Sequence, residues 1–368
     1  MMIQGAPVVL GGKKKSNVLA FAYTGKYNVR DNDVVELLES GEITFVEDGV
    51  IDVFMVGGGG GGGSFTGSAA GSARGGGGGG YTRTVRRVAV TANQSIPITI
   101  GAGGAVNTAG GATAFDTSYS VAGGEGATSN NGAAGGSGGG GAVRSNSDYG
   151  TGGSNGENGG TGYPTSVTGG SGQATTTREF GESTGKLYAG GGGGGRYMAS
   201  NTPIVSLGGS GGGGAGGWGG SYSSDTQAAG AGGANTGGGG GGGASTGSTA
   251  YPAAPGGSGG SGIVCFREAQ ELPELAGTWV LNERLYAPES NFTQTISGTI
   301  ATAQGNAPLY SIVYSNKKMH FYISAVQIFS TYDFDTNQWA NKVSSANFPG
   351  GATASDAFRA WLASNATK

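Results

Sequence analysis

The chain has 368 residues, of which 85 are glycine, and its formal net charge at pH 7 is −3. Glycine at several times its usual frequency of about 7% excludes an ordinary globular composition for at least part of the chain. The small acidic excess argues against nucleic acid or an anionic membrane as a partner, because both attract basic surfaces.

The single cysteine, Cys265, allows no disulfide within the chain and no metal site built from several cysteines. No apolar stretch is long enough to span a membrane as a helix, and the N-terminal residues lack the pattern of a signal peptide. We therefore expect a soluble protein that is made and folded in a cytoplasm.

Glycine divides the sequence into three regions. Residues 57–262 hold 74 of the 85 glycines, without the three-residue period and the high proline content of collagen. The expected organisation is an N-terminal attachment segment over residues 1–50, a glycine-rich domain over 51–268 and a C-terminal domain over 272–368.

The N-terminal segment contains strand signals. Residues 17–23 and 43–56 are rich in β-branched and aromatic side chains, and Glu47-Asp48-Gly49 lies between two apolar runs, which predicts a hairpin turn. Residues 51–56 lead directly into the first glycine run, and Gly262 leads directly into the apolar residues 263–266. Pairing of these two strands would close the glycine region as one domain.

Uninterrupted glycine runs occupy residues 57–63, 75–80, 190–195 and 237–243. A flexible linker is the simplest alternative for such a composition. Three features count against it: aromatic residues between the runs, a length beyond that of any linker, and strand signals at 81–91 and 95–100, which predict a second hairpin.

Ordering so much glycine costs roughly 1 to 2 kcal/mol per residue, and no side chain offsets it. Backbone hydrogen bonds between closely packed chains are the remaining source of stability. The polyproline II conformation has three residues per turn and points every N–H and C=O outward, so glycine helices of this kind can bond to several neighbours. The sequence therefore predicts a mainly β fold with a bundle of polyglycine II helices and loops at its ends.

Four phrases carry a resemblance to a known family. They are Val-Phe-Met-Val at 53–56 before a glycine run, Tyr-Thr-Arg-Thr-Val at 81–85 after another, Ile-Thr-Ile-Gly-Ala-Gly-Gly at 98–104, and Gly-Gly-Ser-Gly-Ile-Val-Cys-Phe at 259–266. Over about residues 40–266 the chain resembles the glycine-rich domain of bacteriophage tail proteins and their prophage homologues. It is also similar in principle to tail-fibre adhesins of T-even-like phages, in which polyglycine II helices present variable loops to a host receptor. Animal receptors with glycine-rich domains differ by carrying many cysteines and a transmembrane helix.

The C-terminal region has an ordinary composition. Residues 277–285, 292–300, 309–314, 319–323 and 325–329 have the character of successive strands, and residues 355–364 that of a helix capped by Ser355. These signals predict a small α+β domain with one helix on an antiparallel sheet. We expect Trp279, Trp339 and Trp361 to be packing residues of this domain. The region resembles a module often attached to phage glycine-rich proteins, which implies no activity.

The sequence contains no complete catalytic or metal-binding motif. A lone histidine, His320, supports neither a catalytic triad nor a multi-histidine metal site. Residues 181–187 have the wrong spacing for a phosphate loop, and the segment from Asp333 lacks the glycine and the terminal glutamate of a calcium loop. We expect no enzymatic activity and no cofactor, although paired carboxylates of a depolymerase remain an alternative.

The leading functional hypothesis is a virion tail protein, made in the host cytoplasm, that acts as a receptor-binding adhesin. Its partners would be other phage tail or baseplate proteins and a host receptor that is a protein or a glycan, with a homotrimer as one arrangement. Binding loops combine tyrosine with small polar residues. The candidate receptor-binding residues on this criterion are Tyr149, Tyr163, Tyr188, Tyr197, Trp218 and Tyr222. Each could instead seal an edge of the bundle. The alternative function is a purely structural tail, baseplate or capsid-surface component; an ice-binding protein is disfavoured, because the glycine region has no strict repeat.

Overall fold

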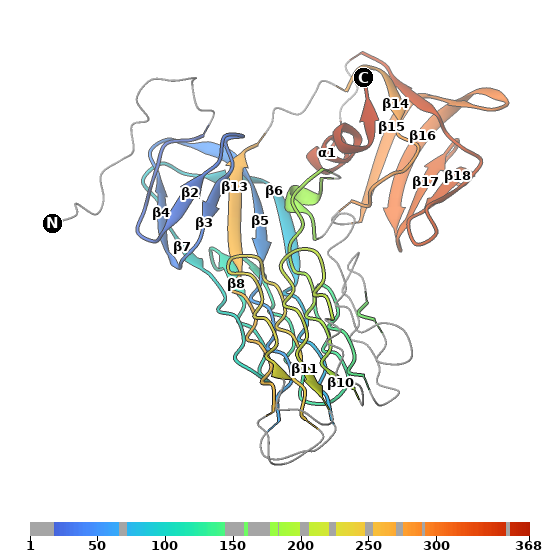
Figure 1. Cartoon of the computed structure of the whole chain (residues 1–368). Coiled ribbons are helices and arrows are strands. Elements are labelled where there is room, and N and C mark those ends of the chain that lie inside the picture. Colours follow the sequence, from blue (N-terminus) through green and yellow to red (C-terminus); the bar gives the residue numbers. More distant parts are fainter. Residues whose placement is uncertain are drawn as a thin grey trace. The chain divides into compact units, whose positions relative to one another are not determined.

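The computed structural model describes residues 18–65, 72–143, 158–160, 177–182, 184–198, 206–220, 226–246, 253–269, 275–288, 291–350 and 354–368. The chain forms two compact units, Met1–Ala269 and Gln270–Lys368 (Figure 1). The described residues are mainly β-structure, with one α-helix near the C-terminus.

The first unit begins with two five-stranded antiparallel sheets. The first sheet has the order β1 (Phe21–Tyr23), β4 (Gly41–Phe45), β7 (Ser95–Thr99), β8 (Thr113–Phe115) and β9 (Tyr119–Val121). The second has the order β2 (Tyr27–Val29), β3 (Val35–Leu37), β13 (Ile263–Glu268), β5 (Gly49–Val56) and β6 (Thr82–Val90). Alternate side chains of both sheets meet in one buried core. Phe45 and Phe266, for example, lie with their ring centroids 5.6 Å apart.

The predicted pairing of the two strands that flank the glycine region is confirmed. Strands β5 and β13 are antiparallel, with Val56 opposite Ile263. Both predicted hairpins are wrong. Residues 46–48 join β4 to β5, and the turn at 92–94 joins β6 to β7, yet in each case the two strands belong to different sheets. The two sheets pack face to face as a β-sandwich, and each of these connections crosses from one sheet to the other. The two strands that it joins therefore face each other across the core instead of pairing within one sheet.

The glycine segments leave these strands and run away from the sheets (Figure 1). Their backbones are hydrogen-bonded to one another, and every third residue of the run 57–63 donates to the same neighbour. Residues 57, 60 and 63 donate to segment 75–81, residues 58 and 61 to segment 108–111, and residues 59 and 62 to segment 257–260, with N···O distances of 2.8 to 2.9 Å. One run therefore bonds three different neighbours in rotation.

Central and peripheral segments differ in burial. All residues of runs 57–63, 75–80, 190–195 and 237–243 are buried. Peripheral segments instead expose every third residue, and these positions carry side chains, as at Ala228, Ala231 and Ala234, or at Pro255 and Ser258. Unbroken glycine therefore marks the segments that other chains surround on all sides.

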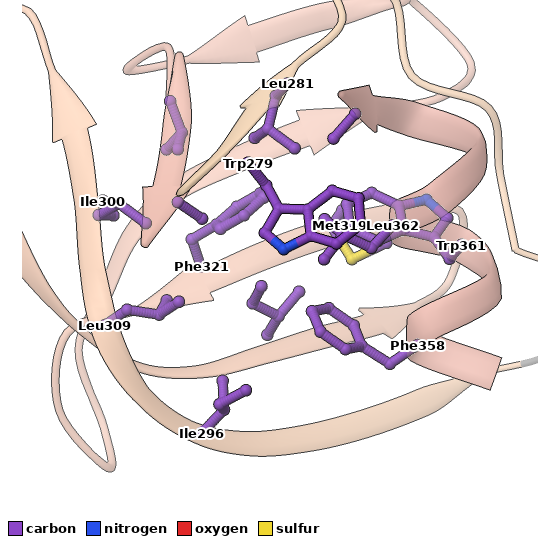
Figure 2. Close-up of a cluster of buried hydrophobic side chains, with 14 of the residues drawn as sticks. Trp279, Leu281, Ile296, Ile300, Leu309, Met319, Phe321, Phe358, Trp361 and Leu362 are labelled. Carbon is purple, nitrogen blue, oxygen red and sulfur yellow. The ribbon is translucent and has the colours of Figure 1, made fainter. Parts of the chain in front are cut away.

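The second unit holds an eight-stranded antiparallel sheet. Its order is β19 (Gln338–Ala340), β18 (Ile328–Asp333), β17 (Lys318–Tyr322), β16 (Gly305–Ser315), β15 (Phe292–Thr302), β20 (Ser345–Phe348), β14 (Gly277–Leu281) and β21 (Ala366–Thr367). The helix α1 (Asp356–Asn365) packs on this sheet. Phe358, Trp361 and Leu362 extend from α1 into the core (Figure 2).

The predicted helix and its cap are confirmed, because the Ser355 side chain accepts a hydrogen bond from the Phe358 amide. The predicted strand at 325–329 is displaced. Strand β18 begins only at Ile328, since Gln327 closes a turn by accepting from the Ile323 amide. Trp279 and Trp361 are buried, and Trp339 packs against Phe321, as expected of packing residues.

Candidate binding site

Residues 66–71, 144–157, 199–205, 221–225 and 247–252 lie outside the described residues. The described residues that border these five gaps lie at the end of the glycine region away from β5 and β13 (Figure 1). The flanking residues meet through the bridges Ala73–Ala244, Ala244–Ala254 and Val143–Arg196. They also meet in a small sheet of β10 (Arg196–Met198), β11 (Trp218–Gly220) and β12 (Thr226–Gln227). We call this the distal end.

Two predicted binding residues lie at the distal end. Tyr197 is half-buried and packs against Ala73, Ala142 and Ala244. Trp218 is only 3% exposed. Within the described part of the chain, the indole N–H of Trp218 has no hydrogen-bond partner. We call the hydrogen-bonded glycine segments between residues 57 and 262 the glycine lattice. Trp218 therefore packs at the end of this lattice, as expected of an aromatic residue that seals an edge of the bundle.

Tyr188 lies elsewhere and is fully buried against the second sheet. Its hydroxyl donates a hydrogen bond to Glu179 at 3.2 Å and lies 3.8 Å from the Cys265 sulfur. Burial raises the pKa of this hydroxyl well above its ordinary value. With no exposed surface, Tyr188 cannot contact a receptor in the folded protein. The remaining candidates, Tyr149, Tyr163 and Tyr222, lie outside the described residues.

The distal end also holds basic residues that composition did not single out. The Arg74 guanidinium lies 4.6 Å from the centre of the Phe65 ring and donates to the Thr128 carbonyl. Arg196 is partly buried, and this burial lowers the pKa of its guanidinium. Arg74 immediately precedes one glycine run and Arg196 immediately follows another. At these two runs, a charged residue at the boundary of the glycine run is the sequence signal that marks the distal end.

The described residues contain no group of three or more His, Cys, Asp or Glu side chains that could hold a metal ion. The Asp333 carboxylate accepts from the Asp335 and Thr336 amides and pairs with Lys318, so it closes a turn. Cys265 is fully buried, and burial raises the pKa of its thiol. None of the helices described here is long and apolar enough to cross a membrane.

These features define a glycine-lattice domain that is closed at one end by a β-sandwich. The chain belongs to the glycine-rich domain family, whose sequence profile matches residues 39–269. No curated protein matches the chain at a significant level.

Proposed function

We propose that this protein is a bacteriophage tail protein whose first unit acts as a receptor-binding adhesin. One observation carries the proposal: the described residues next to five sequence segments meet at the distal end, where backbone hydrogen bonds and bridges hold them together. Binding residues are commonly found on connecting segments held by a rigid scaffold. Two of the segments contain Tyr149 and Tyr222 among small polar residues, a composition suited to adaptable contacts.

We further propose that the glycine segments are polyglycine II helices packed as a bundle. Successive amides of residues 57–63 donate to three different neighbouring segments, and the pattern repeats every three residues. This period supports the polyglycine II conformation, which has three residues per turn and no internal hydrogen bonds. Full burial of the unbroken runs supports the bundle. NMR couplings across hydrogen bonds provide the test. The Gly57 and Gly60 amides should couple to carbonyls of segment 75–81, and the Gly58 and Gly61 amides to segment 108–111.

The adhesin function is tested by competition with phage adsorption. The purified full chain should reduce adsorption to the host, and replacing residues 144–157 by a Gly/Ser segment of equal length should weaken this inhibition. The matched control replaces residues 116–118, a turn between β8 and β9 in the sandwich. Both variants should keep the melting temperature, because neither replaces a residue of the glycine runs.

The structural alternative gives a different result. A tail, baseplate or capsid-surface component without its own receptor would be found in the virion by immunolabelling, yet its purified form would not compete with adsorption. Inhibition that survives replacement of residues 144–157 would assign the contact to another segment or to the second unit.

A further inference from the structure

A short stretch of chain lies on the outer face of the second sheet, away from the sandwich core. It comprises residues 177–182 and 184–188, includes the 3-10 turn η1 (Glu179–Gly181), and is called the clasp here (green in Figure 1). Beneath it, Phe54 of β5 and Cys265 of β13 lie on the sheet face opposite the sandwich core. Both are fully buried.

Charged side chains attach the clasp to the sheet. Arg30 pairs with Glu179 at 2.5 Å, and Arg267 pairs with Glu182 at 2.5 Å. Arg86, which also pairs with Asp52 of β5, donates a hydrogen bond to the Phe180 carbonyl. The two pairs differ in burial, because the Glu179 side chain is only 7% exposed whereas that of Glu182 is 40% exposed.

Two aromatic rings provide the apolar attachment. The rings of Phe180 and Tyr188 lie 6.2 and 5.3 Å from the Phe54 ring, and the Arg267 guanidinium lies 4.3 Å from the centre of the Phe180 ring. The Tyr188 hydroxyl also contacts the Cys265 sulfur, at 3.8 Å.

The backbone of the clasp bonds to itself. The Glu179 amide donates to the Lys186 carbonyl, the Tyr188 amide donates to the Thr177 carbonyl, and Arg178 forms a bridge with Leu187. In contrast, each attachment to the sheet named above involves a side chain. The clasp can therefore leave the sheet without losing its internal backbone hydrogen bonds.

The closed position carries local costs. Phe180 in the clasp has a φ of 52°, and Ala189, the residue that follows the clasp, has a φ of 57°. Such left-handed conformations are unfavourable for residues other than glycine and mark strain when the residue is bulky. Within the described residues, the buried Nε atom of Arg267 also lacks a hydrogen-bond partner. Strain and incomplete hydrogen bonding bring the closed and open states closer in free energy.

We propose that the clasp is a latch that lifts from the sheet as a preformed unit, while the sandwich and the glycine lattice remain folded. Local openings of this kind have a lower free energy than global unfolding and expose only part of the molecule. Opening uncovers Phe54 and Cys265, so the state of the latch controls access to one face of the second sheet.

Cys265 reports on the latch, because it is the only cysteine of the chain and is 0% exposed when the clasp is closed. The full chain is incubated with a thiol reagent such as DTNB at a series of low urea concentrations. Labelling through the open latch should depend weakly on urea, since little surface is exposed. Global unfolding of the same protein, followed by circular dichroism, should depend steeply on urea.

Three charge-removing variants complete the test. Glu179→Gln should accelerate labelling by about tenfold or more, because hydrogen bonds to charged groups are among the stronger ones. Glu182→Gln should accelerate it less, since the Glu182 side chain is 40% exposed. The matched control is Glu283→Gln, which removes a 2.6 Å ion pair with Lys342 in the second unit and should leave labelling unchanged.

Two outcomes would overturn the proposal. One is labelling of the unmodified chain with the same steep urea dependence as global unfolding, which would mean that the clasp opens only when the whole unit unfolds. The other is an unchanged labelling rate in both Glu179→Gln and Glu182→Gln while circular dichroism shows both variants folded.

Discussion

The central segments of the first unit need glycine because backbone carbonyl groups of neighbouring segments occupy the space that a Cβ atom would fill. A Cβ atom at Gly240 would lie 2.1 Å from the Gly257 carbonyl oxygen, and one at Gly60 would lie 1.9 Å from that of Glu125. Both neighbours are backbone atoms that cannot rotate away. Even an alanine therefore requires two chains of the lattice to separate.

Gly240→Ala should lower the stability of the first unit by roughly 3 kcal/mol or more, the upper part of the range for overpacked cores. The control is Ala231→Val, which adds atoms at an exposed position of a peripheral segment and should change stability by less than about 0.5 kcal/mol. Thermal unfolding by circular dichroism measures both. Similar losses in the two variants would contradict the distinction between central and peripheral segments.

His320 provides a residue-scale test of electrostatics in the second unit. Its Nδ1 lies 2.8 Å from the Thr331 hydroxyl, and burial together with the nearby Lys318 charge lowers the pKa of the ring below its usual 6.5. The folded state thus binds the proton less readily than the unfolded state. The contribution of His320 to stability is therefore complete above pH 6.5 and decreases as pH falls towards the lowered pKa.

Because His320 is the only histidine, an NMR titration of the full chain observes it directly. The midpoint should lie below 6.5, and Lys318→Met should move it upward without abolishing the shift, since burial is the larger cause. Lys342→Met, which removes a charge that pairs with Glu283 instead, should leave the midpoint unchanged. A midpoint at or above 6.5 in the unmodified chain would show that the ring is more hydrated than the structure indicates.

Burial of individual aromatic residues could not be predicted from composition. Tyr188 and Trp218 lie among glycine and small polar residues, as loop residues also do, yet both are buried. What decides their burial is contact with residues distant in sequence, such as Phe54 beside Tyr188. By contrast, Ser355 acts within four residues of chain, and its cap could be predicted.

At the scale of elements, local signals located turns correctly and strand partners less well. The chain does bend next to Asp48, and residues 46–48 join β4 to β5. Which sheet each strand joins is decided by the packing of two sheets, and a turn signal contains no information about that packing. The pairing of β5 with β13 could be predicted because both strands adjoin the glycine region, which fixes their ends together.

The glycine runs should behave as ordered elements in hydrogen exchange. Every amide of residues 57–63 donates to a carbonyl of another segment, and these residues are buried. Their exchange should require opening of the lattice, with a free energy close to that of global unfolding of the first unit. Mass spectrometry of peptides that cover 57–63 measures this exchange, and complete exchange within seconds would contradict an ordered lattice.

At the scale of the whole molecule, two hydrophobic cores are built from separate parts of the chain. The core of the first unit draws on residues 19–266, and that of the second on residues 275–366. The change from glycine-rich to ordinary composition near residue 270 agrees with this division. Composition could indicate the division because each core needs its own set of apolar residues.

Separate cores predict separate unfolding transitions. Trp361 is 4% exposed and donates to the Tyr286 carbonyl, so Trp361→Ala should cost about 3 to 5 kcal/mol in the second unit alone. For a unit of this size the transition should fall by at least about 12 °C. Phe266→Ala, in the core of the first unit, should lower only the other transition. Calorimetry of the full chain measures both, with the transitions assigned by comparison with residues 275–368 alone. A single transition that moves in both variants would instead indicate an interface through which the two units unfold together, because independent units cannot transmit the loss of a buried ring.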